Sequence, residues 1–287
     1  MEKSPTPLVN VRAVIRAKSP ALERYMPSFI IRWLERILHQ DEINEIISLY
    51  GHLSGVPMAV ASLEHLRVSS QSIGLENVPA DGRYVFVSNH PLGGLDGLVL
   101  IKTLGQHFAD IKFIVNDLLL NLTPLESVFV PVNKHGRQSA AYAQRIIDTY
   151  NSDAQILYFP AGLCSRKIKG RVTDLPWKRN VLQKAIKHQR DIVPVFFSGA
   201  NSNFFYRLAN IRKRLGLKFN IEMLYLSDEA FRQKGNNFRL YFGKPIPYSH
   251  FTAEKSLDAW MQDIRQEVYA LPHTYSKSQD DTRNPSH

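Results

Sequence analysis

Cysteine is nearly absent from this sequence of 287 residues, and Cys164 alone cannot form a disulfide within the chain. This fits a reducing cytosol and excludes the class of small secreted proteins held together by disulfides. The sequence also lacks an apolar run of the roughly 18 to 20 residues that a helix needs to cross a bilayer. Its first 20 residues lack the apolar core of a signal peptide. We therefore expect a protein that is soluble or lies on a membrane.

Acidic residues are also fewer than basic ones, with 26 Asp and Glu against 36 Lys and Arg, for a formal net charge of +10. A basic surplus of this size favours an anionic partner such as nucleic acid, an anionic membrane or a phosphorylated substrate. The sequence has no recognised nucleic-acid motif, and its basic residues follow the ends of predicted strands rather than alternating with aromatic residues. We therefore expect no nucleic-acid partner.

The pattern of apolar residues changes near residue 70. Before it, residues 21–68 repeat apolar residues at helical spacing. After it, short β-branched runs alternate with helical stretches. Strands are expected at 84–89, 111–117, 128–133, 154–160, 191–199, 221–226 and 238–246, and helices at 96–108, 138–150, 176–189 and 253–270. This alternation predicts an α/β layered fold with a mostly parallel central sheet flanked by helices.

The same pattern divides the chain into four parts. Residues 1–20 are polar and basic, and we expect them to be flexible. An N-terminal helical element follows at 21–68, the layered domain at 69–271, and a polar tail at 272–287 that we expect to be disordered.

Chemistry is expected where predicted strands end, because ligands bind at the carboxyl ends of strands in α/β sheets. The first such segment is VSNHPLGGLDGL (87–98), in which a strand leads into His90, a glycine turn and Asp96. A histidine can take a proton from an alcohol, and a nearby carboxylate can fix its tautomer. The alternative is a glycine turn with Asp96 as a helix N-cap and His90 on the surface.

Two further segments are basic. VFVPVNKHGRQSA (128–140) places Asn133, Lys134 and Arg137 between a strand and a helix, and LYFPAGLCSRKIKGR (157–171) follows a strand with Gly162, Ser165 and Arg166. Cationic side chains and main-chain amides could bind an anionic head group at both. Solvated basic loops are the alternative. We do not interpret Cys164 as a nucleophile, because no dedicated base stands beside it in the sequence.

A fourth segment, DIVPVFFSGANS (191–202), is an apolar strand that contains Pro194. Proline fits poorly inside a central strand, so Pro194 predicts a bend or an edge. Pro194 and Phe196 could line a channel for an acyl chain, although most residues of this segment are expected in the core.

Together, NHPLGGLD, FVPVNKHGR, FPAGLCSR and IVPV resemble, in order, the four sequence blocks of the lysophosphatidate acyltransferase-like family. The resemblance covers about residues 70–250 and implies a glycerol-3-phosphate acyltransferase-like layered fold. It implies that His90 deprotonates the acceptor hydroxyl, that Asp96 orients His90, and that no metal or cofactor is needed beyond acyl-CoA or an acyl carrier protein as co-substrate. It assigns acceptor binding to the polar residues of the second and third blocks, and acyl-donor binding to the fourth. The acceptor-binding residues would be Asn133, Lys134, Arg137, Gly162, Ser165 and Arg166.

The sequence departs from the family pattern at two places. Five residues separate His90 from Asp96 instead of four, and Ala161 stands where the third block has a glutamate. Losing that glutamate indicates a different acceptor. The pattern resembles bacterial hemolysin-like proteins and acyltransferases of amino-acid lipids, which acylate a lyso-ornithine or lyso-glycine lipid.

We therefore expect an acyltransferase that moves an acyl group from a thioester to the hydroxyl of a lyso-lipid in bacterial membrane lipid synthesis. A 1-acyl-glycerol-3-phosphate acyltransferase is one alternative, and a non-catalytic lipid-binding module with the same fold is another. The resemblance also implies that residues 21–68 dock on an anionic membrane, so we expect a cytoplasmic protein peripheral to the inner face of the cell membrane. The sequence leaves the oligomeric state open.

Overall fold

The computed structural model describes residues 8–132 and 139–283. Within them, a seven-stranded sheet has the order β1-β9-β8-β2-β5-β3-β4. The strands are β1 Ser69–Ile73, β2 Tyr84–Ser88, β3 Ile111–Asn116, β4 Phe129–Val132, β5 Gln155–Tyr158, β8 Asp191–Phe197 and β9 Asn237–Phe242. All neighbouring strands are parallel except β8 and β9. The prediction of a mostly parallel sheet is confirmed.

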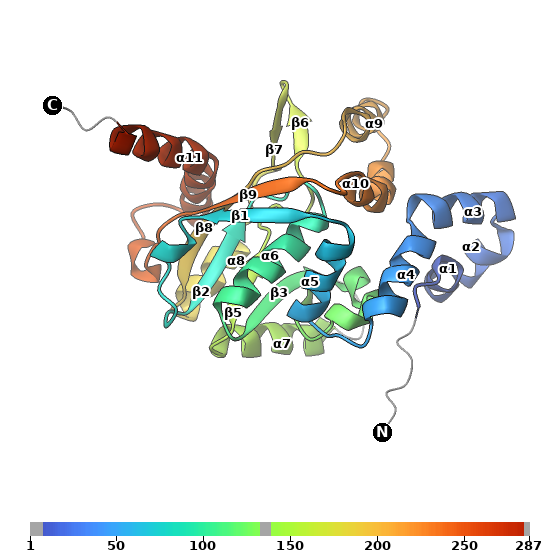
Figure 1. The fold of residues 1–287 in the computed structure, drawn as a ribbon, viewed down its shortest axis with the longest axis horizontal. Coiled ribbons are helices and arrows are strands. Elements are labelled where there is room, and N and C mark those ends of the chain that lie inside the picture. Colours follow the sequence, from blue (N-terminus) through green and yellow to red (C-terminus); the bar gives the residue numbers. More distant parts are fainter. Residues whose placement is uncertain (1–7, 133–138, 284–287) are drawn as a thin grey trace.

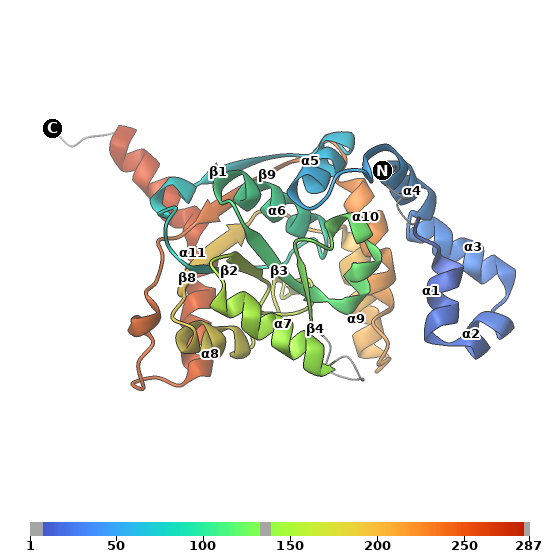
Figure 2. The ribbon, with the colours of Figure 1, turned by 90° about the horizontal axis from the view of Figure 1, so that it is seen from below.

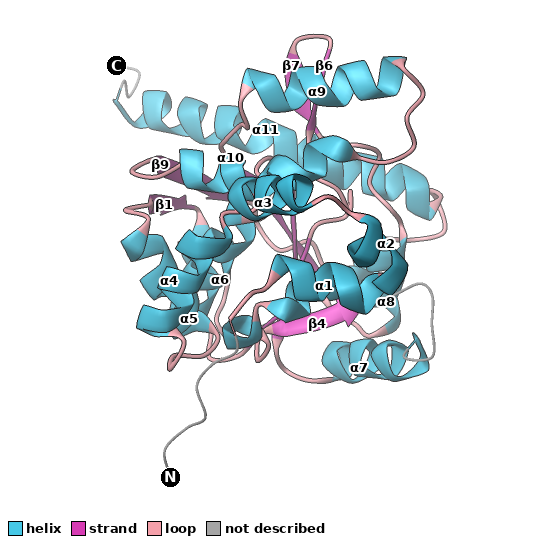
Figure 3. Cartoon of the chain, turned by 90° about the vertical axis from the view of Figure 1, so that its right-hand side faces the viewer, coloured by secondary structure: helices cyan, strands magenta, loops and turns pink. Residues whose placement is uncertain are grey.

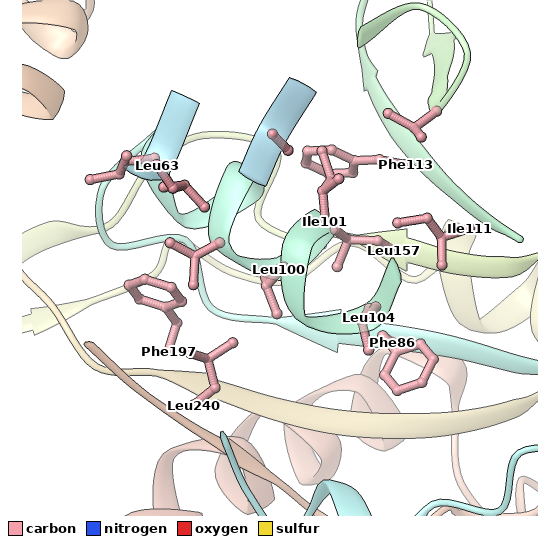
Figure 4. Packing of buried hydrophobic residues seen from close by; sticks show 14 of the residues in the cluster. Leu63, Phe86, Leu100, Ile101, Leu104, Ile111, Phe113, Leu157, Phe197 and Leu240 are labelled. Atoms are coloured by element: carbon pink, nitrogen blue, oxygen red, sulfur yellow. The ribbon is translucent and has the colours of Figure 1, made fainter. Parts of the chain in front are cut away.

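Helices cover both faces of this sheet. Helices α5 (Val56–His65) and α6 (Leu95–His107) lie on one face, and α7 (Ser139–Asn151), α8 (Asn180–Lys187) and α11 (Leu257–Arg283) on the other (Figures 1 and 2). Leu100, Ile101 and Leu104 of α6 pack over the strands in the first core layer (Figure 4). Because both faces are covered, the central strands are apolar along their whole length. β2 is buried at every position.

The N-terminal helices extend away from the sheet (Figure 1). They are α1 Val11–Lys18, α2 Pro20–Tyr25, α3 Ser28–Ile37 and α4 Gln40–Tyr50. Helix α1 replaces part of the segment 1–20 that the sequence analysis expected to be flexible. Asn10 caps it by accepting the N–H of Ala13 at 2.8 Å, and Gln40 of α4 accepts the N–H of Val11 at 2.8 Å. The sequence analysis missed this helix because its contacts to α4 are non-local.

The C-terminal helix also differs from the expectation. Helix α11 runs to Arg283 and contains Pro272, whereas the sequence analysis expected disorder from residue 272. Leu271 is buried, and the hydroxyl of Tyr275 donates to the carbonyl of Phe242 in β9 at 2.6 Å. These contacts hold the helix together beyond Pro272, although a proline in a sequence usually indicates the end of a helix.

Several elements between 160 and 240 were not expected. The segment 221–226, predicted as a strand, forms the 3-10 helix η4 (Ile221–Tyr225), in which Glu222 is fully buried. In this region, the elements that the sequence analysis did not predict are the hairpin β6 Arg166–Ile168 and β7 Arg171–Thr173 and helices α9 Asn203–Arg214 and α10 Leu226–Arg232. Outside it, the strand β1 was also not predicted. The short 3-10 helices η1 Leu75–Asn77, η2 Asp117–Asn121, η3 Thr123–Leu125 and η5 Tyr248–His250 complete the described elements.

Pro194 lies inside a central strand, so the prediction that it marks an edge is wrong. β8 pairs with β2 on one side and with β9 on the other. The ladder to β9 is interrupted here, because Val195 pairs with Phe242 and the next pair is Ile192 with Ile246. Pro194 therefore occupies a position where its missing N–H leaves no ladder bond unmade.

Candidate active site

The sheet brings the first and third predicted segments together, because β2 and β5 are direct neighbours. His90 follows β2 and Phe159 follows β5. Their rings stack with centroids 3.9 Å apart and an angle of 17° between their planes. The N–H of Ser165 donates to the carbonyl of His90 at 2.7 Å. Two segments that are about 70 residues apart in sequence therefore form one unit at the carboxyl ends of the central strands.

His90 and Asp96 are in direct contact despite the five residues between them. The imidazole Nδ1 lies 2.9 Å from Oδ2 of Asp96, and the N–H of Leu92 also donates to Oδ2 at 2.9 Å. The N–H of Gly97 donates to Oδ1 at 3.0 Å. Asp96 is fully buried, and the side chain of His90 is 15% exposed. The carboxylate therefore fixes the imidazole and also accepts a main-chain N–H in the first turn of α6, whose N-cap is Gly94.

The extra residue is accommodated at a glycine. Gly93 has φ of +80°, a left-handed conformation that favours glycine. A Cβ at this position would lie 2.7 Å from Cδ2 of Leu226 in α10 and 3.1 Å from Cβ of Cys164. The left-handed conformation and the close neighbours therefore favour glycine at this position of the longer turn.

The charges around His90 suit a base. Burial alone would raise the pKa of Asp96, but the attraction of His90 and the hydrogen bonds from His90 and main-chain amides outweigh it, so this pKa is lowered. Asp96 is therefore a carboxylate at neutral pH and keeps the proton of His90 on Nδ1. Among the described residues, none forms a hydrogen bond with Nε2 of His90. This nitrogen is free to accept a proton from a bound hydroxyl.

A second buried carboxylate, Asp174, holds the backbone of the site, and the sequence analysis missed it. Its Oδ1 accepts the main-chain N–H of His90 at 3.2 Å and the hydroxyl of Ser165 at 2.5 Å. Its Oδ2 accepts the indole N–H of Trp177 at 2.8 Å. Burial raises the pKa of Asp174, although these donors act in the opposite direction. Asp174 lies 84 residues after His90 in a segment without a recognised motif, so no sequence signal pointed to it.

Helix α11 supports Asp174 from the other face of the sheet. The N–H of Asp174 donates to the hydroxyl of Tyr269 at 2.8 Å, and Arg265 donates to the carbonyl of Asp174 at 3.1 Å. The Arg265 guanidinium also lies 5.2 Å from the centre of the Tyr269 ring. The C-terminal helix is therefore connected to the candidate base through one residue.

Two predicted acceptor-binding residues make internal contacts. Ser165 is buried and donates to Asp174. Arg166 pairs with Oε1 of Glu222 at 3.0 Å and donates to the carbonyl of Cys164 at 2.8 Å. Glu222 also pairs with Arg212 of α9 at 3.0 Å. These contacts give Ser165 and Arg166 a structural role, and their acceptor-binding role stays a prediction.

Gly162 is exposed at the turn after β5, with φ of +68°. A Cβ on it would lie 3.0 Å from Nζ of Lys178. The main-chain N–H of Lys178 donates to the carbonyl of Pro160 at 3.1 Å. The turn therefore has a cation beside it that the sequence analysis did not single out. Lys178 is exposed, and no ion pair to it is present among the described residues.

The other predicted acceptor-binding residues, Asn133, Lys134 and Arg137, lie outside the described residues. They follow β4, which β5 and β3 separate from β2. At about 4.8 Å between neighbouring strands, β4 is roughly 14 Å from β2. The carboxyl end of β4, at Val132, therefore lies at the same edge of the sheet as His90, with two strands between β4 and β2.

Pro194 and Phe196 lie in the core layer under α11. The ring of Phe196 contacts those of Tyr269 and Tyr241, with centroids 5.7 and 6.2 Å apart. Pro194 packs toward Leu271 of α11 at Gly243. Their role in an acyl channel stays a prediction.

Cys164 is not an activated nucleophile. It is fully buried, and burial raises its pKa to about 12. Among the described residues, no group of three or more His, Cys, Asp and Glu side chains could hold a metal ion.

Comparisons with known proteins show the family to which the chain belongs. The model of the acyltransferase family matches residues 13–277. The chain is 44% identical over 265 residues to the lyso-glycine lipid O-acyltransferase of Bacteroides thetaiotaomicron, covering 92% of this chain and 97% of that protein. It is 42% identical to the protein of the same name from Phocaeicola vulgatus, covering 92% of this chain and 95% of the relative.

Among solved structures, the chain is similar to the 1-acyl-sn-glycerophosphate acyltransferase PlsC from Thermotoga maritima. The TM-score is 0.44 and the identity 18%, over 75% of this chain and 81% of the other. The match of the family model over most of the chain, together with two relatives above 40% identity, shows that the chain belongs to the acyltransferase family and is an acyltransferase.

Proposed function

We propose that this enzyme transfers a fatty acyl group from an acyl thioester to the hydroxyl of a lyso-amino-acid lipid, with a lyso-glycine lipid as the first candidate. The observation that carries the proposal is the contact of 2.9 Å between His90 and the buried carboxylate of Asp96. The names of the two relatives support the acceptor. The absence of the family's glutamate at Ala161 supports an acceptor other than lysophosphatidate.

In this reaction, Nε2 of His90 takes the proton of the acceptor hydroxyl as its oxygen attacks the thioester carbonyl. An oxygen–carbon bond forms and the carbon–sulfur bond breaks. The proton then passes from the imidazolium to the leaving thiolate, so no covalent acyl-enzyme is required. Asp96 stabilises the imidazolium while it exists, because it faces Nδ1 as a buried carboxylate.

Lys178 is suited to the head group of such an acceptor. An amino-acid lipid with a free carboxylate is anionic, and Nζ of Lys178 stands beside the exposed turn at Gly162. A lysophosphatidate acceptor is the second candidate, because the same cation would attract a phosphate. The first alternative from another class was a lipid-binding module without activity. The longer spacing that favoured it does not separate His90 from Asp96.

We also propose that the enzyme works as a peripheral protein on the inner face of the cell membrane, where a lyso-lipid resides. Leu22, Tyr25 and Phe29 in the N-terminal helices are each more than half exposed. Exposed apolar side chains on a basic protein support attachment to an anionic surface. None of the described helices has both the length and the apolar character to span a membrane.

The test is mass spectrometry of products from purified protein. The protein is given acyl-CoA or acylated carrier protein and, in turn, a lyso-glycine lipid, a lyso-ornithine lipid and lysophosphatidate. We expect a diacyl product with the lyso-glycine lipid, and a rate lower by about 10²-fold or more in His90→Ala, since a lost general base costs about 10²- to 10⁴-fold.

His52→Ala is the matched control, because His52 is exposed in the loop after α4. Full activity of His90→Ala would contradict the mechanism. A preference for lysophosphatidate would show that the proposed lyso-glycine acceptor is wrong. No product with any pair of substrates would favour the non-catalytic lipid-binding module.

A further inference from the structure

Helix α9 carries an apolar stripe that faces away from the protein. Phe204, Leu208, Ile211 and Leu215 recur at spacings of four, three and four residues along it, which is the spacing of one helical face. The exposed fractions of Phe204, Ile211 and Leu215 are 48%, 54% and 66%. The opposite face of α9 already supplies its packing through Phe205. The stripe is therefore additional to what holds α9 on the domain.

The loop after α9 continues this surface. Leu217 and Phe219 are 51% and 67% exposed. We call the exposed apolar residues of α9 and this loop the α9 surface; its members are Phe204, Ile211, Leu215, Leu217 and Phe219. Monomeric proteins rarely gather so many large apolar side chains at one exposed place unless something binds there.

The charge around the α9 surface has one sign. Residues 201–220 contain no Asp or Glu and five basic residues, which are Arg207, Arg212, Lys213, Arg214 and Lys218. Arg212 pairs with the buried Glu222, and within the described part of the chain the other four make no ion pair. Apolar side chains with basic neighbours are the composition of a helix that lies in the interface of an anionic membrane.

The α9 surface joins the exposed residues of the N-terminal helices. The ring of Trp33 in α3 contacts that of Tyr225, with centroids 6.2 Å apart, and Tyr225 contacts Phe204 of α9 at 5.1 Å. Figure 3 shows α9 and α1–α3 on the same side of the molecule. These contacts make the two exposed apolar regions continuous across η4.

We propose that the α9 surface is a membrane-docking site, inserted at the boundary between head groups and acyl chains of an anionic bilayer. The occupant is a bilayer rather than an acidic protein, because three of its side chains expose more than half of their area in the segment 211–217 and Phe219 follows them. Basic side chains alone would be enough to attract an acidic protein, so such a partner would not explain the exposed apolar side chains. The N-terminal helices are already expected to dock on the membrane, and the α9 surface would be a second contact. The reason for this second contact rests on the proposed function, in which the acceptor is a lipid of the membrane.

The position of α9 fits this role. Helix α9 follows β8, and Asn89, next to His90, bonds to β8 through both the N–H and the carbonyl of Phe197 at 2.7 and 3.0 Å. The hydroxyl of Ser202 caps α9 and donates to the buried Glu229 at 2.5 Å. The helix is thus fixed at the same edge of the sheet as His90, so a bilayer bound to it would present lipids to that edge.

The test measures binding of the full chain to vesicles of phosphatidylcholine with phosphatidylglycerol, and to vesicles of phosphatidylcholine alone. We expect the double variant Leu215→Ser/Phe219→Ser to bind the anionic vesicles at least tenfold more weakly, because two large apolar side chains no longer insert. Lys213→Gln/Lys218→Gln should bind the anionic vesicles more weakly, with no change for vesicles of phosphatidylcholine alone, because each basic residue near the surface contributes to the attraction. Lys187→Gln is the matched control for charge, since Lys187 is exposed in α8, outside both the α9 surface and the N-terminal helices.

A second measurement separates this proposal from the proposed function. Acyl transfer to a short-chain, water-soluble acceptor should be the same in the double variant and the parent, and the circular dichroism melting temperatures should agree. Vesicle binding equal to that of the parent would overturn the proposal. Unchanged vesicle binding with weaker binding of acyl carrier protein would assign the surface to a protein partner and overturn it too. If the parent transfers no acyl group at all, the proposed function fails while the vesicle result still decides the docking site.

Discussion

The imidazole of His90 is fixed on three sides. Asp96 bonds to Nδ1, the ring of Phe159 stacks on its face, and Asp174 accepts its main-chain N–H. These contacts allow the ring only one orientation, so the position of Nε2 is set before substrate binds. Preorganisation of this kind lowers the cost of reaching a reactive geometry.

Asp96→Asn should lower kcat by about 10²- to 10⁴-fold with little change in KM, because an amide can donate to Nδ1 and so favour the wrong tautomer. The measurement is the steady-state rate of diacyl lipid formation. Asp110→Asn is the control, since Asp110 is exposed and far from His90 in the fold. Equal loss in both variants would show that the effect is general rather than specific to the base.

Stability should respond to acid through the same carboxylate. The pKa of Asp96 is lowered in the folded protein, so its contribution is complete above the unfolded value of about 3.9 and is lost as the pH falls through the folded value. The urea midpoint of Asp96→Asn should therefore fall less than that of the parent when the pH is lowered below about 4.

Cys164 should not react with an alkylating reagent in the native protein. Burial raises its pKa to about 12, so at pH 8 the thiol is protonated as well as inaccessible. Mass spectrometry after treatment with N-ethylmaleimide should find the native chain unmodified and the chain in urea modified once. Rapid labelling of the native protein would mean that the packing around Gly93 and Cys164 opens.

At the scale of elements, the sequence predicted the parts of the site that are local. His90 and Asp96 stand six positions apart, so a motif could find them, and their contact is confirmed. Most strands were found because burial on both faces makes them continuous apolar runs. The strand β1 was missed because its sequence, SSQSI, is polar at the edge of the sheet.

Non-local contacts were beyond the sequence. Asp174 reaches His90 only through the fold, and the ion pair between Arg166 and the buried Glu222 joins residues 56 positions apart in the sequence. Glu222 lies in a segment with the apolar pattern of a strand, but the segment forms a 3-10 helix in which Glu222 is buried and pairs with two arginines. A single sequence does not reveal which charged residues are paired inside the protein.

Arg190 is another residue whose role could not be predicted from the sequence, because its buried partners lie far away along the chain. It is fully buried before β8, and its guanidinium donates to the carbonyls of Tyr150, Ala154 and Thr149 at 2.9, 2.8 and 3.2 Å. Arg190→Leu should therefore destabilise the protein by about 3 kcal/mol or more, since several buried carbonyls lose their donors. The measurement is the free energy of unfolding in urea. Arg239→Leu, on the exposed side of β9, is the control and should change it by less than about 0.5 kcal/mol.

At the scale of the molecule, the net charge of +10 should govern attachment to membranes. Each basic residue near an anionic surface contributes about 1 kcal/mol, and salt screens this attraction beyond about 8 Å at physiological ionic strength. Binding to phosphatidylglycerol vesicles should therefore fall as sodium chloride is raised, without reaching zero, because the apolar side chains remain inserted. Binding that is indifferent to salt would assign attachment to the apolar side chains alone.

The bond between Tyr269 and Asp174 has a consequence for how the enzyme is made. The loop that holds His90 is fixed by a helix near the C-terminal end of the described chain, and the ribosome delivers that helix after the sheet. A nascent chain can pair β2, β5 and β8 and still lack the hydroxyl that fixes Asp174. Catalysis should therefore begin only after helix α11 has been translated and has packed on the sheet, so a chain that still lacks α11 should fold around the sheet without acyl transfer.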